Sequence, residues 1–88
     1  MFRLWAKIWN DNHLIQDMVV ENEENDTRTH KIFHALEQVC YAYDLSKPIW
    51  LNSNVAEFKK RSNTRFTKDN FVDEISFDYL EFQILEED

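Results

Sequence analysis

Two stretches near the N-terminus carry the hydrophobic patterns of β-strands. In residues 2–9 (FRLWAKIW) the even-numbered side chains are apolar, while the odd-numbered ones alternate a cation with tryptophan. This period of two is typical of a half-buried strand. Residues 14–20 are rich in strand-forming residues, and residues 10–13 (NDNH) supply the asparagine and aspartate that tolerate a left-handed backbone. The pattern predicts a β-hairpin with a four-residue loop.

A helical pattern follows the acidic connector 21–26. Asp26 or Thr27 is a suitable N-cap, and from there to about Asp44 the apolar residues recur three and four positions apart. These residues form one continuous apolar stripe along the predicted helix: Ile32, Phe33, Leu36, Val39, Cys40 and Tyr43. The spacing predicts one long amphipathic helix that packs on a sheet.

The second half of the chain predicts a short helix and a closing strand. Pro48 ends the helical register, because the residue before a proline is pushed toward an extended backbone. Asn54 with Glu57 resembles a capping box that opens a helix over residues 55–62. Alternation returns over residues 75–86 and predicts the last strand.

These elements predict a single α+β domain over residues 1–88, with a mainly antiparallel sheet of three strands, or alternatively four. One face of the sheet packs on the long helix. The other face is expected to be too apolar to leave in water, and it would carry Trp5, Trp9, Ile15, Val19, Phe77 and Tyr79. Either the segment 48–72 or another chain should therefore cover it.

Composition acts mainly by excluding function classes. The chain has 88 residues, no glycine and one cysteine, Cys40. Phosphate-binding loops, dinucleotide fingerprints and nucleophile elbows all depend on glycine. Cys40 lies on the apolar stripe, so we expect a core residue rather than a nucleophile. With no recognisable nucleophile–base pair, the sequence predicts no enzyme, no catalytic residue and no cofactor.

The net charge of −7 makes nucleic acid an unlikely ligand, since phosphate contacts require a positive surface. The bases cluster in residues 59–68, which hold Lys59, Lys60, Arg61, Arg65 and Lys68 and no acid. We interpret this segment first as solvated surface, second as a contact to an acidic protein surface, and third as a nucleic-acid contact. The acidic remainder leaves an alternative open, an inhibitor that mimics nucleic acid and captures a basic nuclease or DNA-binding protein.

His30 and His34 lie four residues apart on the predicted helix, the spacing that puts two imidazoles over one metal ion. A site would still need a third ligand, and neither His13 nor Cys40 is placed to supply one. The sequence therefore predicts no metal site, and it leaves open whether this pair binds a metal.

No run approaches the roughly 18 apolar residues of a membrane span. Arg3 and Lys7 interrupt the first nine residues, unlike the apolar core of a signal peptide. We therefore expect no membrane association and a cytoplasmic location.

Several motifs together resemble a family of small uncharacterised proteins from Gram-positive anaerobes. They are FRLW at 2–5, DTRTHK at 26–31, DLSKPIWL at 44–51, EFK at 57–59, TRF at 64–66, DNF at 69–71 and DYLE at 78–81. The resemblance covers nearly the whole chain. It implies an accessory single-domain cytoplasmic protein, and it implies no activity, ligand or catalytic residue.

The function predicted from these observations is protein–protein contact. A homodimer is the simplest way to cover the sheet face that the long helix leaves exposed. Tryptophan and tyrosine are the residues that anchor protein interfaces. The candidate interface residues are Trp5, Trp9 and Tyr79, followed by the basic residues Lys59, Lys60, Arg61, Arg65 and Lys68.

Overall fold

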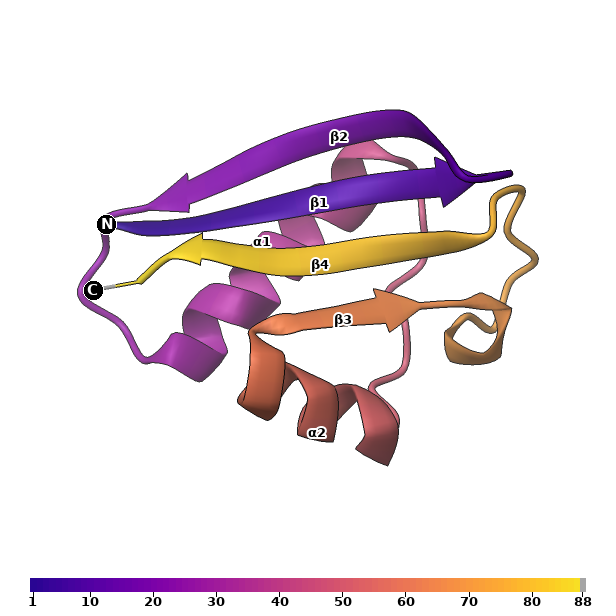
Figure 1. Ribbon diagram of the computed structural model, residues 1–88. Coiled ribbons are helices and arrows are strands. Elements are labelled where there is room, and N and C mark those ends of the chain that lie inside the picture. The colour runs from indigo at the N-terminus through magenta and orange to yellow at the C-terminus, as the bar shows by residue number, and fades with distance from the viewer. Residues whose placement is uncertain (88) are drawn as a thin grey trace.

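The computed structural model describes residues 1–87 and contains one antiparallel sheet of four strands with both helices on one side (Figure 1). The strands are β1 (Phe2–Asn10), β2 (His13–Asn22), β3 (Asn63–Phe66) and β4 (Tyr79–Glu86). The helices are α1 (Arg28–Ala42), α2 (Asn52–Arg61) and the short 3-10 helix η1 (Lys68–Asn70). The strand order is β2-β1-β4-β3. The α+β class and the antiparallel sheet are confirmed, and the sheet has the larger of the two predicted strand numbers.

The hairpin between β1 and β2 is confirmed, but its turn has two residues instead of the predicted four. Asp11 and Asn12 have φ angles of 52° and 63°, which two-residue hairpin turns favour. In the absence of glycine, aspartate and asparagine are the residues that adopt this backbone at low cost. The Asp78 carboxylate accepts a hydrogen bond from Asp11 N–H at 2.9 Å and ties the turn to the segment before β4.

Helix α1 begins after Thr27, whose hydroxyl accepts a hydrogen bond from His30 N–H. It ends at Ala42, slightly before the predicted end, because Asp44 turns into the left-handed region with φ 55°. Cys40 O accepts a hydrogen bond from Leu45 N–H at 2.8 Å, the long closing bond of a Schellman-type helix end. Cys40 is 3% exposed, so its assignment to the core is confirmed.

Helix α2 begins at Asn52, three residues before its predicted start, so Leu51 is its N-cap residue and Asn54 is its third residue. Asn54 is buried and forms a polar cluster. Its Oδ1 accepts from Leu51 N–H at 3.1 Å and from Asn70 Nδ2 at 2.7 Å, and its Nδ2 donates to Thr64 Oγ1 at 2.9 Å. The cluster fastens α2, β3 and η1 to one another.

Strand β3 was not predicted as an element, because its four residues are too few to show a period. Strand β4 begins at Tyr79 instead of the predicted residue 75. The residues before it form a loop that still contributes to the core. In that loop Phe77 meets Phe71 edge to face, with ring centroids 6.3 Å apart.

The segment between the two helices closes the core on the side of α1. The ring of Trp50 contacts those of Phe33, Phe58 and Phe66 at centroid distances of 6.2, 5.6 and 5.0 Å. Phe58 in turn packs near Phe82 of β4. Within residues 48–72, α2 and Trp50 therefore pack on the same side of the sheet as α1, and β3 is a strand of the sheet itself (Figure 1). The expectation that this segment covers the opposite face is wrong.

Candidate functional site

The face of the sheet that no helix covers, called the open face from here on, is lined by the odd-numbered residues of β1. It is a network of aromatic and charged groups, not the apolar surface that we expected. Lys7 Nζ donates to Gln83 Oε1 at 2.9 Å and lies 3.4 Å from Glu81 Oε1. Trp9 Nε1 donates to the same Glu81 oxygen at 2.9 Å. The polar atoms of this face are thus largely satisfied within the chain.

Two residues predicted for the open face lie elsewhere. Phe77 packs on the core beside Phe71. Ile15 lines a hollow with Tyr43 and Leu45 at the end of α1, because a bulge shifts the pairing of β1 with β2 at this point. Strand pairing keeps the remaining predicted residues together on the open face: Trp5 beside Val19, and Trp9 beside Tyr79.

Glu81 occupies the middle of the open face. Burial would raise the pKa of its carboxyl, but hydrogen bonds from Asn63 and Trp9 and the charge of Lys7 outweigh burial and lower it. Asn63 Nδ2 reaches the second carboxylate oxygen at 2.7 Å. The carboxylate is therefore ionised at neutral pH and held from both neighbouring strands.

Cations and rings alternate across the open face. Lys7 Nζ lies 3.9 Å from the centroid of the Trp5 ring, and Arg65 Cζ lies 4.7 Å from that of Tyr79. The Trp9 and Tyr79 rings are tilted toward each other at 6.4 Å. Such cation–π contacts hold the rings in fixed positions, which lowers the entropic cost of using them to bind a partner.

The two edges of the open face carry opposite charge. The β2 edge holds Asp17 and Glu21, whereas the β3 edge holds Arg65. Leu14 and Val19, which pair with β1 residues on this face, are 43% and 41% exposed. The open face therefore combines exposed apolar side chains, half-buried aromatic rings and a charge gradient across the strands.

The basic segment 59–68 does not form one site. Lys59, Lys60 and Arg61 occupy the last turn of α2, where cations favour the helix C-terminus. Arg65 lies on the open face, and Lys68 begins η1. Within residues 1–87 none of these five cations forms an ion pair with a carboxylate.

A second apolar surface lies between the helices. A groove of about 190 Å³ is lined by Phe33, Trp50 and Val55 and flanked by Arg28 and Lys59. Phe33 was predicted for the buried stripe of the helix but is 45% exposed here. The buried Nε1 of Trp50 has no hydrogen-bond partner within residues 1–87. This helix groove competes with the open face as a contact surface.

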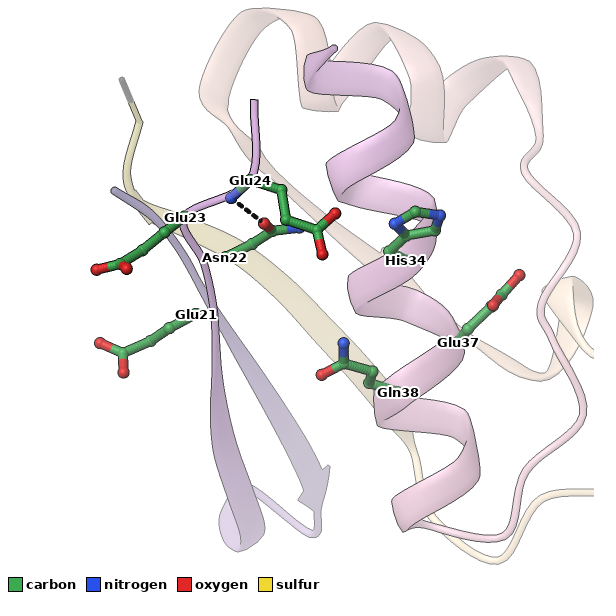
Figure 2. A pocket seen from close by; sticks show the side chains of 7 residues that line it. All are labelled: Glu21, Asn22, Glu23, Glu24, His34, Glu37 and Gln38. Atoms are coloured by element: carbon green, nitrogen blue, oxygen red, sulfur yellow. Dashed lines mark hydrogen bonds between the residues drawn. The ribbon is translucent and has the colours of Figure 1, made fainter. Parts of the chain in front are cut away.

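An acidic hollow of about 490 Å³ separates the end of β2 from α1 (Figure 2). Its lining comprises Glu21, Asn22, Glu23, Glu24, His34, Glu37 and Gln38. Figure 2 shows Glu24 turned toward His34, while Glu21 and Glu23 point away from the helix. His30 Nδ1 lies 2.9 Å from Asp26 Oδ1. The fold thus gives His34 acidic neighbours that the spacing of the two histidines did not predict.

No family model, curated protein or solved structure matches this chain. The resemblance to small proteins of Gram-positive anaerobes therefore stays a prediction. Neither helix within residues 1–87 has the length and apolar character needed to cross a bilayer.

The alternating pattern placed Trp5, Trp9 and Tyr79 on one face of the sheet. It did not predict the hydrogen bonds that Lys7 and Trp9 make on that face. Alternation does place Glu81 on the side of Tyr79. Its contacts with Trp9 and Asn63, however, depend on β4 lying between β1 and β3. Strand order was the missing information, because β3 was not recognised.

Proposed function

We propose that this chain acts by protein–protein contact, without catalysis, as a cytoplasmic homodimer in which two open faces pack together. The supporting observation is the combination of half-buried rings of Trp5, Trp9 and Tyr79 with exposed Leu14 and Val19 on a face that residues 1–87 leave uncovered. Aromatic anchors within a polar surround are typical of protein interfaces.

The charges favour one arrangement of the two copies. A two-fold axis parallel to the strands stacks β3 of one copy over β2 of the other, and β1 over β4. Arg65, Glu81, Lys7 and Asp17 lie at one level across the four strands, so Arg65 then faces Asp17 of the partner copy and Lys7 faces the partner's Glu81. An axis lying across the strands would instead stack β3 over β3 and oppose like charges. The first arrangement makes the interface electrostatically self-complementary.

The state of the cysteine supports a non-catalytic role. Burial raises the pKa of the Cys40 thiol to about 11, so the nucleophilic thiolate is scarce at neutral pH. The residue lies against the core and not in the acidic hollow or the helix groove.

Analytical ultracentrifugation of the full chain over a wide concentration range tests the homodimer. Val19→Asp puts a carboxylate into the proposed interface beside the acidic β2 edge. We expect the dimer dissociation constant to rise about tenfold or more, since every 1.4 kcal/mol lost is about tenfold in affinity. Val72→Asp is the matched control, because Val72 is 82% exposed and lies outside the sheet; we expect no change.

Charge exchange sharpens the test. Arg65→Glu should weaken the dimer, and adding Asp17→Arg should restore it, because only the parallel axis brings these two positions together across the interface. The proposal is wrong if the wild-type chain stays monomeric at millimolar concentration. It is equally wrong if Val55→Asp in the helix groove, and not Val19→Asp, dissociates the dimer. A monomer that binds a basic DNA-binding protein in a strongly salt-dependent way would favour the acidic mimic instead.

A further inference from the structure

The loop between β2 and α1 gathers three potential metal ligands beside the acidic hollow. Glu24 and Asp26 belong to this loop, and His34 lies in the second turn of α1. One ligand atom from each of the three lies within 4.8 Å of the others. Bonds from zinc to oxygen and nitrogen are about 2.0–2.2 Å, so ligands around one ion lie up to about 4 Å apart. Small rotations of Glu24 and His34, both exposed, close the remaining gap.

Asp26 is already fixed in place. Its Oδ1 accepts hydrogen bonds from His30 Nδ1 at 2.9 Å and from Thr27 N–H at 2.8 Å. Both act on the same oxygen and leave Oδ2 for another ligand. The Asp26 carboxylate therefore needs little reordering to bind a cation.

His30 therefore orients Asp26 through a hydrogen bond without being one of the three ligands. Outer hydrogen bonds of this kind orient the ligands of metal sites and contribute to their affinity. The helical spacing of His30 and His34 places one imidazole behind Asp26 and the other beside it. Glu24 is oriented in turn, because its N–H donates to Asn22 Oδ1 at 2.7 Å.

The mixture of donors selects the class of cation. Carboxylate and water oxygens alone suit magnesium and calcium, whereas an imidazole nitrogen favours zinc, cobalt and nickel. Among the further carboxylates that line the hollow, Glu23 adds negative potential that attracts a dication, whereas Glu21 and Glu37 are paired with Arg3 and Lys47. Three protein ligands leave room for water to complete the coordination shell.

We propose that Glu24, Asp26 and His34 bind one divalent cation of the zinc class, with His30 as the residue that positions Asp26. The ion joins the loop after β2 to α1 beside the acidic hollow, where Figure 2 shows Glu24 turned toward His34. This site is separate from the open face, so it neither requires nor excludes the proposed homodimer.

Calorimetric titration of the full chain with zinc ions, repeated with cobalt ions while their visible absorption is followed, tests the proposal. We expect one ion per chain, with a cobalt spectrum that changes on binding. His34→Ala should abolish binding. His30→Ala should weaken it about tenfold, the scale typical of an outer hydrogen-bond partner. Circular dichroism of each variant establishes that it is folded.

His13→Ala is the matched control, since His13 is an exposed histidine beside the hairpin turn and far from this loop in sequence. It should bind zinc as the wild type does. The site does not exist as proposed if zinc binds His34→Ala and the wild type equally, or if His13→Ala loses binding. Tighter binding of magnesium or calcium than of zinc would also overturn it, because the imidazole would then have no role.

Discussion

The two faces of the sheet use aromatic residues in opposite ways. On the helix side, Phe66 and Phe82 are 0% exposed and pack ring against ring with Trp50 nearby. On the open face, Trp5 and Trp9 each donate a hydrogen bond to a carboxylate and remain partly exposed. The chain completes the first face by itself. The second is held in shape by its polar contacts while its rings stay accessible, which is why we assign contact function to it.

The largest expected difference in unfolding free energy is between variants of Phe82 and Gln83, two neighbouring residues of β4 that point to opposite faces of the sheet. Phe82→Ala removes a fully buried ring and should cost about 3–5 kcal/mol of unfolding free energy. Gln83→Ala, one residue further on β4, removes an acceptor of Lys7 and should cost about 0.5–1.5 kcal/mol. Urea unfolding followed by circular dichroism measures both. Similar costs for the two variants would contradict the distinction between a packed face and an accessible one.

The fold was predictable where a long pattern determined it. The alternation of residues 2–9 and the helical stripe before Asp44 predicted β1 and α1, and the polar turn residues predicted the hairpin. Strand β3 could not be found in this way, since only Thr64 and Phe66 of its four residues face the core. Without β3, the sequence did not decide between three and four strands, and it did not predict that Asn63 contacts Glu81.

Residues whose role depends on tertiary contacts were missed for a related reason. Asn54 was predicted as the N-cap of a helix, but it is a buried residue inside α2 whose side chain forms hydrogen bonds with Thr64 and Asn70. Glu24 and Asp26 looked like an acidic connector, although α1 folds back to bring His34 beside them. In both cases the local chemistry was correct and the partner lay elsewhere in the chain. Patterns within one segment do not carry that information.

A smaller effect tests the polar network at the centre of the open face. Asn63, Trp9 and Lys7 hold the pKa of Glu81 below its ordinary value of 4.5 despite partial burial. Because the folded pKa is the lower one, Glu81 stabilises the fold above its unfolded pKa, and this contribution is lost as pH falls through the folded pKa. Glu81→Gln should therefore cost about 1–2 kcal/mol at neutral pH, and the difference from the wild type should shrink as the pH falls below 4.5.

Urea unfolding of both proteins across this pH range makes the measurement. Glu37→Gln is the control: a hydrogen bond from Lys47 at 3.0 Å and its charge lower the pKa of Glu37 too, but both side chains are exposed. Water and salt screen such a pair, so we expect a change that is hard to resolve and that disappears at high salt. A constant penalty for Glu81→Gln at every pH would mean that the charge of Glu81 does not contribute to stability.

The smallest expected effect separates the contribution of the Trp5 ring from that of its N–H group. Trp5→Phe removes the N–H that donates to Asp17 Oδ2 at 2.8 Å and keeps an aromatic ring near Lys7. Since this hydrogen bond is exposed, its loss should cost only about 0.5–1 kcal/mol of unfolding free energy. In the proposed homodimer the ring supplies the contact and the N–H only orients it. Sedimentation should therefore show a dimer nearly as strong for Trp5→Phe as for the wild type, and a weaker one for Trp5→Ala. If Trp5→Phe weakens the dimer as much as Trp5→Ala does, the contact depends on the hydrogen bond to Asp17, and ring packing does not explain the open face.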